Sequence, residues 1–108
     1  MQAKRIEQLK NFQKEDPSDP FPKYALALEY LAHQPEKSKA LFEELLEKHP
    51  HYSATYYHAA DFFYRIDEIE KARAVYSKGI EILKSTDDTK ALRELQNAYQ
   101  NFQFEVDY

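Results

Sequence analysis

The sequence matches itself when it is shifted by about 34 residues, a period typical of helical repeat proteins. The matched pairs are Ser38 with Ala72, Phe42 with Tyr76, and Leu45 with Gly79. Upstream the offset is one residue shorter, since Leu26-Ala27 precedes Ala59-Ala60, and one deletion in the turn at 32–35 reconciles the two offsets. Such a chain buries its apolar residues by stacking similar units against one another.

Within each repeat the apolar residues are spaced as they are on α-helices. In the first segment Ile6, Leu9 and Phe12 recur at steps of three, and similar steps continue to Phe102. No comparable run alternates with a period of two, so strands are not indicated. The pattern predicts about six helices, near 3–15, 20–33, 36–48, 53–65, 68–84 and 88–103.

Capping residues and prolines stand at the predicted helix starts. Asp19-Pro20 places a capping side chain ahead of proline, and Gln34-Pro35 offers a weaker version of the same start. Asp67 with Glu70 resembles a capping box, and Thr86-Asp87-Asp88 supplies caps for the last helix. The connections between these starts are short, so neighbouring helices must pack antiparallel.

The composition excludes several classes of protein. Among 108 residues there are one Gly and no Cys, which argues against all-β folds, glycine-rich phosphate loops, disulfides, thiolate nucleophiles and cysteine zinc sites. The net charge of -4 and the lack of a basic cluster argue against nucleic-acid binding. No apolar stretch reaches the roughly 20 residues of a membrane span, and no signal-peptide core is present. We therefore expect a cytoplasmic protein that does not bind membranes.

The repeat resembles the tetratricopeptide family, whose unit is a pair of helices with a pattern of large and small residues. In the second unit the pattern is carried by Tyr56, Ala59-Ala60, Phe63, Ala72, Tyr76 and Gly79. The first unit offers Leu26-Ala27, Tyr30, Ser38, Phe42 and Pro50, with Lys23 where the family has Trp. Gly79, the only glycine, falls mid-helix where the pattern requires a small side chain, so we expect close helix packing there.

This resemblance implies an all-α fold, a right-handed solenoid of antiparallel helix pairs. We expect one domain over 1–108, with two full units and two flanking half-units. The parts would be an N-terminal half-unit at 3–17, a first unit at 18–50, a second unit at 51–84, and a capping helix with a tail at 85–108.

The resemblance also implies a protein-interaction module, because the first helix of each pair lines a concave surface on which peptides lie. The residues that fall at those places are Phe21, Tyr24, Leu28 and Leu31 in the first unit, and Tyr57, Asp61, Tyr64 and Arg65 in the second. They exceed what the core requires, and aromatic residues and Arg are common anchors of binding surfaces. Asp61 and Arg65, one helical turn apart, would pair with each other or orient the charges of a ligand.

Three uses of this surface stay open. It would be a groove for a protein or peptide partner, a surface covered by helix 88–103 or the tail 104–108, or a face that forms a homodimer. The family's carboxylate clamp, which holds the C-terminus of chaperone peptides, is not expected, because its places hold Tyr24, Leu28 and His58.

Catalytic and metal sites are not indicated. The four histidines, His33, His49, His51 and His58, lack the i, i+4 pair common in zinc sites. Adjacent acidic residues such as Glu43-Glu44 fall on predicted solvent faces, and no serine has the glycine-flanked context of a nucleophile. We expect a non-enzymatic protein without a cofactor or metal.

Overall fold

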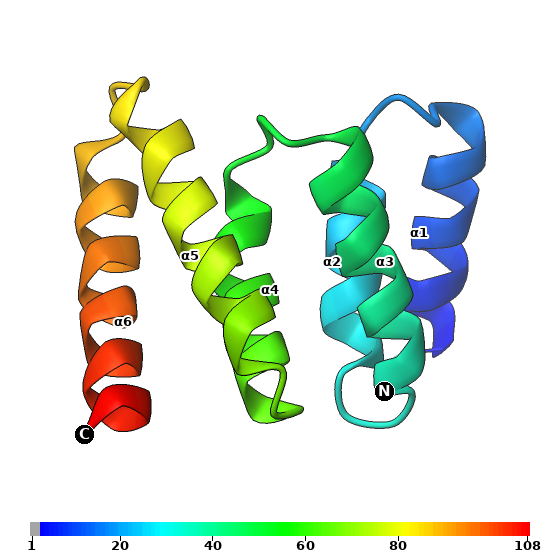
Figure 1. Cartoon of the computed structure of the whole chain (residues 1–108). Coiled ribbons are helices and arrows are strands. Elements are labelled where there is room, and N and C mark those ends of the chain that lie inside the picture. The colour runs from blue at the N-terminus through cyan, green and yellow to red at the C-terminus, as the bar shows by residue number, and fades with distance from the viewer. Residues whose placement is uncertain (1–2) are drawn as a thin grey trace. The chain divides into compact units, whose positions relative to one another are not determined.

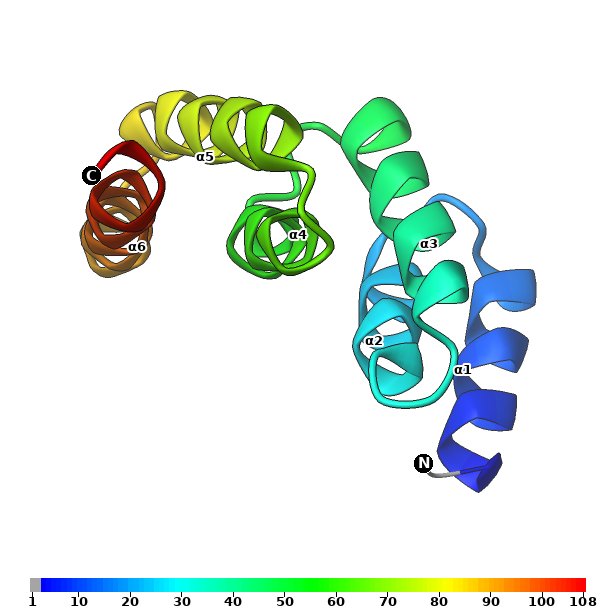
Figure 2. The ribbon, with the colours of Figure 1, turned by 60° about the horizontal axis from the view of Figure 1, so that its bottom comes forward.

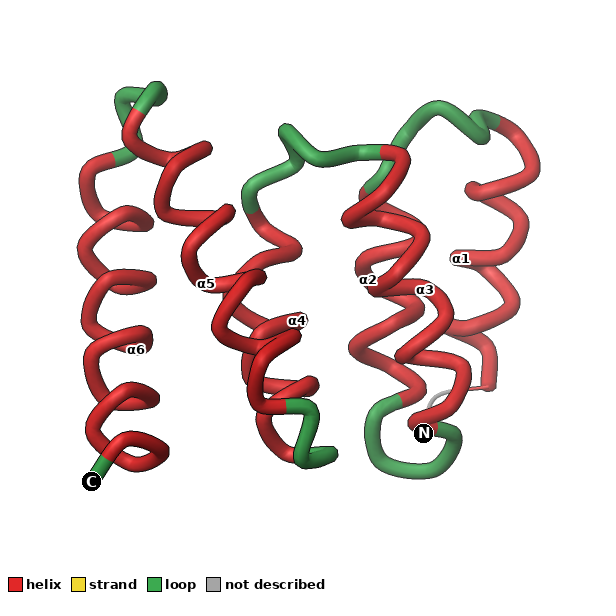
Figure 3. Tube along the Cα trace, in the orientation of Figure 1, coloured by secondary structure: helices red, strands yellow, loops and turns green. Residues whose placement is uncertain are grey.

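The computed structural model describes residues 3–108, which form six α-helices and no strand (Figures 1 and 3). The helices are α1 (Ala3–Glu15), α2 (Phe21–Tyr30), α3 (Pro35–Lys48), α4 (Ala54–Arg65), α5 (Ile69–Lys84) and α6 (Thr89–Asp107). The predicted all-α class and the order of the helices are confirmed.

Two helices end elsewhere than the sequence pattern predicted. Helix α2 stops at Tyr30 rather than at residue 33, because the N–H of Leu31 turns back tightly to the carbonyl of Leu28 and Pro35 already begins α3. Helix α6 continues to Asp107, through most of the segment that we expected to be a tail. That segment contains no Gly or Pro, and the half-buried Val106 extends the inner face of the helix.

The predicted caps are confirmed at two helix starts and wrong at a third. Oδ1 of Asp88 accepts the N–H of Ala91 at 3.0 Å, and Oδ1 of Asp19 accepts the N–H of Phe21 at 3.0 Å. Asp67 does not cap α5; its φ is 65° and it closes α4 instead.

The closure at Asp67 is the two-bond turn that helices usually complete with glycine. The N–H of Asp67 bonds the carbonyl of Tyr64 at 3.0 Å, and the N–H of Glu68 bonds the carbonyl of Phe63 at 2.8 Å. Aspartate tolerates the left-handed conformation better than most residues, so this chain makes the turn without its single glycine.

The chain divides into two compact units, the first ending at Tyr52 and the second beginning at Ser53. In the first, α2 packs against both α1 and α3. Its core holds Ile6, Leu9, Ala25, Leu26 and Tyr30, with Leu41 against it. The buried Oγ of Ser38 donates to the carbonyl oxygen of Ala27 at 2.6 Å, which ties α3 to α2.

In the second unit α5 packs against both α4 and α6, which lie on the same side of it (Figure 2). Gly79 of α5 faces both neighbours. A Cβ at this position would lie 2.6 Å from the Cβ of Tyr56 and 2.8 Å from Cδ2 of Leu95. The expected close approach at the lone glycine is confirmed, and it brings three helices together.

None of the helices formed by residues 3–108 is long and apolar enough to cross a membrane.

Candidate partner-binding surface

Helix α2 carries three of the four site residues predicted for the first unit, and Leu31 follows its last residue. Phe21 is 47% exposed and Leu31 is 37% exposed, whereas Tyr24 and Leu28 are half-buried. The ring of Tyr24 meets the ring of Tyr52 edge to face, with centroids 5.8 Å apart. Burial raises the pKa of both phenols, so they stay neutral over the physiological range. The helix therefore presents two exposed apolar side chains and a partly packed tyrosine.

Helix α4 carries the four residues predicted for the second unit. Tyr57 is 46% exposed, and its ring lies edge to face with that of His58 at 5.4 Å. Nε of Arg65 donates to Oδ2 of Asp61 at 2.8 Å, which is the predicted pairing across one helical turn. Arg65 is largely exposed and Asp61 is partly exposed, so the pair contributes little to stability.

Tyr64 differs from Tyr57 because α6 reaches it. Its hydroxyl donates to the carboxylate of Glu105, and its ring lies edge to face on Phe102 with centroids 5.3 Å apart. The hydrogen bond to Glu105 is the main cause that raises the pKa of Tyr64. Helix α6 thus packs against Tyr64, whereas Tyr57, the other predicted site tyrosine of α4, is 46% exposed.

Between α4 and α6 there is a pocket of about 170 Å³. Its lining residues are Tyr57, Asp61, Tyr64, Tyr76, Ala98, Asn101, Phe102 and Glu105. Tyr76 forms the floor from α5; burial is the main cause that raises its pKa to about 12, and the charge of Asp61 adds to it. Three of the predicted site residues, Tyr57, Asp61 and Tyr64, are brought together here.

Sequence reasoning missed the wall that α6 contributes, namely Ala98, Asn101, Phe102 and Glu105. These residues recur at steps of three and four, so they lie on one face of the helix. The sequence could have indicated this wall, because Ala98 and Phe102 belong to the helical apolar pattern of α6 and Asn101 and Glu105 lie beside them.

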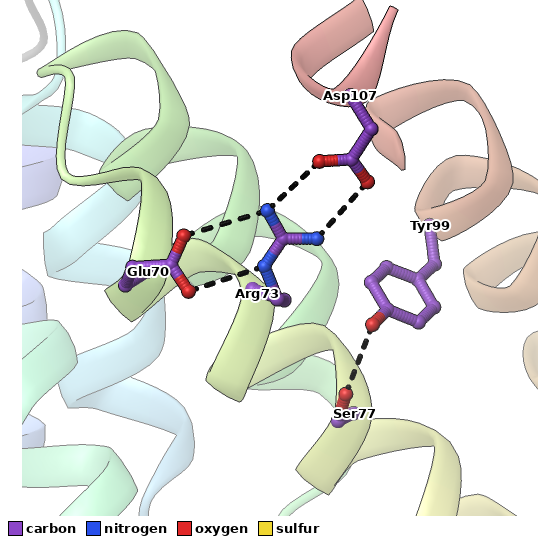
Figure 4. Close-up of polar contacts among 5 residues, drawn as sticks. All are labelled: Glu70, Arg73, Ser77, Tyr99 and Asp107. Atoms are coloured by element: carbon purple, nitrogen blue, oxygen red, sulfur yellow. Dashed lines mark hydrogen bonds and ion pairs between the residues drawn. The ribbon is translucent and has the colours of Figure 1, made fainter. Parts of the chain in front are cut away.

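An arginine from α5 holds the C-terminal end of this wall in place (Figure 4). The guanidinium of Arg73 donates to both carboxylate oxygens of Asp107 at 3.2 Å, and it also bonds Glu70 on its own helix. It lies over the ring of Phe102 at 5.5 Å from the centroid. Nearby, Oγ of Ser77 and the hydroxyl of Tyr99 are 3.3 Å apart. The paired carboxylates raise the pKa of Arg73, so the contact persists at every physiological pH.

The model of the tetratricopeptide repeat family matches residues 29–95, more than half of the sequence. The chain belongs to the tetratricopeptide repeat family. Two solved structures agree with this, both of a tetratricopeptide repeat domain protein from Salinibacter ruber. Its solution NMR structure is 43% identical, has a TM-score of 0.75, and the match covers 82% of this chain and 90% of that one. Its crystal structure is 42% identical, has a TM-score of 0.73, and the match covers 79% and 96%.

No protein of curated function matches the chain. Tetratricopeptide repeats generally mediate protein–protein interactions, and they are typically not enzymes. Within the part of the chain that the structure describes, no group of three His, Cys, Asp or Glu side chains is placed to hold a metal ion.

In terms of the tetratricopeptide repeat, α6 takes the place of a first helix whose core positions have become polar. The residues about 34 positions after Tyr56, Ala59, Ala60 and Phe63 are Lys90, Arg93, Glu94 and Asn97, and all four are exposed. This outer face of α6 therefore lacks the apolar side chains with which α4 binds α5. The face that lines the pocket carries the buried Phe102 together with the polar Asn101 and Glu105.

A second pocket, of about 420 Å³, lies in the N-terminal unit and includes none of the predicted site residues. It is lined by Ala3, Ile6, Glu7, Lys10, Tyr30, Gln34 and Lys37. Nζ of Lys37 lies 5.2 Å from the centroid of the Tyr30 ring. Its rim carries two lysines, in contrast to the acidic pocket between α4 and α6.

Proposed function

We propose that this tetratricopeptide repeat protein binds a protein or peptide partner through exposed side chains of α2 and of α4, without catalysing a reaction. The observation that carries the proposal is the pocket beside α4, where Tyr57 stays 46% exposed at the rim of a cavity walled by three helices. A tyrosine at such a rim offers a large contact area and a polar tip. Interface anchors are typically aromatic residues seated beside a pocket.

The N-terminal unit supports the same proposal with a different kind of surface. Phe21 and Leu31 expose apolar area at the two ends of α2, and Tyr24 and Leu28 lie between them. Exposed apolar side chains that cluster on one helix mark interaction surfaces in soluble proteins. We propose that α2 makes apolar contacts with the partner, whereas the polar side chains of the pocket beside α4 select which partner binds.

A peptide-display selection tests this proposal. The full chain is used to select binders from a random library, and the affinity of the enriched peptides is measured by fluorescence anisotropy for the wild type and for Tyr57→Ala. We expect Tyr57→Ala to weaken binding by about tenfold or more, as for an interface anchor. Phe104→Ala is the matched control, because Phe104 is an exposed aromatic residue outside the pocket lining. Equal losses in the two variants, or none in either, would contradict the proposal.

Self-association through the same residues is the competing use of this surface, and the exposed Phe21 and Leu31 are the observation that favours it. Light scattering on the full chain separates the two. A mass of 12.9 kDa at micromolar concentration identifies a monomer with a free surface. A doubled mass that reverts to the monomer in Phe21→Ser/Leu31→Ser would identify a homodimer instead.

A further inference from the structure

The pocket between α4 and α6 has two carboxylates on its lining, each with an oxygen to spare. Asp61 uses Oδ2 for Arg65, and Glu105 uses Oε2 for Tyr64. Oδ1 of Asp61 and Oε1 of Glu105 have no hydrogen-bond partner among the described residues. Two carboxylates that each have an unused oxygen, from two helices, therefore line one small cavity.

The rest of the lining is chiefly aromatic. Tyr57, Tyr64, Tyr76 and Phe102 line the same cavity as the two carboxylates, and the faces of such rings attract cations. The protein itself already shows this chemistry, because the guanidinium of Arg73 lies over the ring of Phe102. A second cation entering from solvent would meet rings of the same kind together with free carboxylate oxygens.

The charges around the pocket favour a cation. Arg65, at the end of α4, is already bound to Asp61. Arg73 of α5 is already engaged by Glu70 and Asp107. With Glu105 there are four carboxylates against two guanidiniums, so the region is negative. The charges of Asp61 and Glu105 both add to the rise in the pKa of Tyr76.

We propose that this pocket binds an arginine side chain of the partner polypeptide, with the guanidinium bridging Asp61 and Glu105 and lying against the tyrosine rings. This proposal rests on the proposed function and narrows it to a chemical class of partner. The volume of about 170 Å³ suits one extended side chain and is too small for a drug-sized ligand. A planar guanidinium satisfies two carboxylate oxygens and an aromatic face at once, which a lysine ammonium does less well.

Titration with two defined peptides tests the proposal. The probes are acetyl-Ala-Ala-Arg-Ala-Ala-amide and the same peptide with citrulline, which has the shape of arginine but no charge. Binding is followed by ¹H–¹⁵N NMR of the full chain at millimolar peptide. We expect the arginine peptide to shift the amides of Tyr57, Asp61, Asn101 and Glu105, and to bind about fivefold tighter than the citrulline peptide at low salt.

The variant Asp61→Asn/Glu105→Gln keeps the size of both side chains and the hydrogen bond to Tyr64. We expect it to lower the affinity for the arginine peptide to that for citrulline. Glu94→Gln is the control for net charge, because Glu94 lies on the exposed outer face of α6, and it should leave the affinity unchanged. The spectra of the free variants show directly whether they remain folded.

Three results would overturn the proposal. They are equal affinity for the two peptides, arginine-dependent shifts located outside the pocket, and the absence of shifts at millimolar peptide. None of these results contradicts partner binding itself, which is decided separately by the effect of Tyr57→Ala on the selected peptides. Selected peptides that depend on Tyr57 but tolerate citrulline in place of arginine would uphold the proposed function and reject the arginine site.

Discussion

The two repeat units place different residues at equivalent packing positions. In the first unit these positions hold Lys23 and Leu45, and in the second they hold Tyr56 and Gly79. Leu45 is completely buried, whereas the Cβ and Cγ of Tyr56 occupy the space beside Gly79 where a side chain would lie. The second unit thus combines Tyr56 on its first helix with Gly79 on its second helix. The first unit has Lys23 and Leu45 at these two places. The close contact of Tyr56 with Gly79 therefore has no room for the leucine that the first unit carries at the equivalent place.

The units also differ in their buried polar groups. Lys23 is only 6% exposed and its Nζ lies 2.8 Å from the carboxylate of Glu44. Ser38 donates to the carbonyl of Ala27, whereas Ala72 at the equivalent place has no hydroxyl. In the second unit Thr55 is completely buried, and its hydroxyl has no hydrogen-bond partner among the described residues. The buried Lys23 and Ser38 of the first unit are therefore paired, whereas the buried Thr55 hydroxyl of the second is not paired with any described residue.

The largest expected effect is that of removing Leu45. Leu45→Gly leaves a cavity and adds a flexible residue to α3, so we expect a loss of about 4 kcal/mol in the free energy of unfolding. Glu47→Gly in the same helix is the control; Glu47 is exposed, so only the helix-propensity cost of about 1 kcal/mol is expected. Urea unfolding measures both. Similar losses in the two variants would show that the side chain of Leu45 is not part of a packed core.

The second-largest effect is expected for the reverse substitution at Gly79, the position equivalent to Leu45. In Gly79→Leu the new side chain would collide with Tyr56 and Leu95, and we expect a loss of about 3 kcal/mol, the upper part of the usual range for overpacking. Ala74→Leu, at an exposed place on the same helix, should stay within about 0.5 kcal/mol of the wild type. Thermal unfolding that is unchanged in Gly79→Leu would refute the close packing of α4, α5 and α6.

The third change makes the first unit resemble the second. Ser38→Ala removes the hydrogen bond to the carbonyl of Ala27 and leaves that buried oxygen without its donor, at a cost of about 1–2 kcal/mol. Ser77→Ala is a suitable control, because the Ser77 hydroxyl is exposed and its contact with Tyr99 is long. Native-state hydrogen exchange should show the loss in α2 and α3. An effect no larger than that of Ser77→Ala would mean that the bond contributes nothing.

The sequence predicted the fold well because helix formation and repeat packing depend on local spacing. The six helices, the starts at Pro35 and Asp88, and the close approach at Gly79 all follow from residues near one another in the chain. Asp67 was misread because a cap and a left-handed turn use the same residue type, and only the backbone angle separates them.

The candidate site was less predictable, since it depends on contacts between helices far apart in the sequence. The pattern placed Tyr57, Asp61 and Tyr64 on one face of α4, but it did not show that Glu105 would bond Tyr64 from α6. That contact depends on the rotation of α6, whose apolar face does not follow the repeat positions. The ion pair between the buried Lys23 and Glu44 was also missed, because the family pattern has no lysine at that place and so indicates no partner for it.

A smaller effect is expected on the pH dependence of the stability of the first unit, through its Lys23–Glu44 ion pair. The hydrogen bond from Lys23 is the first cause that lowers the pKa of Glu44 below its ordinary value of 4.5. The folded state therefore gains stability from ionised Glu44; this gain is complete above the ordinary value and is lost as the pH falls through the lowered one. Glu44→Gln should cost about 1 kcal/mol at neutral pH and almost nothing in acid. Glu43→Gln, an exposed neighbour, should show no such pH-dependent difference in urea unfolding.

The smallest expected change has the opposite sign, and it tests whether the second unit bears an unsatisfied polar group. Thr55→Val replaces the buried hydroxyl with a methyl group of similar shape and keeps the β-branched side chain. Because the hydroxyl has no partner to lose, we expect the free energy of unfolding to stay the same or to rise by about 0.5 kcal/mol. The same kind of change at the satisfied hydroxyl, Ser38→Ala, is expected to destabilise. A loss of 1 kcal/mol or more in Thr55→Val, on the order of a broken hydrogen bond, would show that Thr55 has a bonding partner in solution. The contrast between the two units would then be one of packing volume alone.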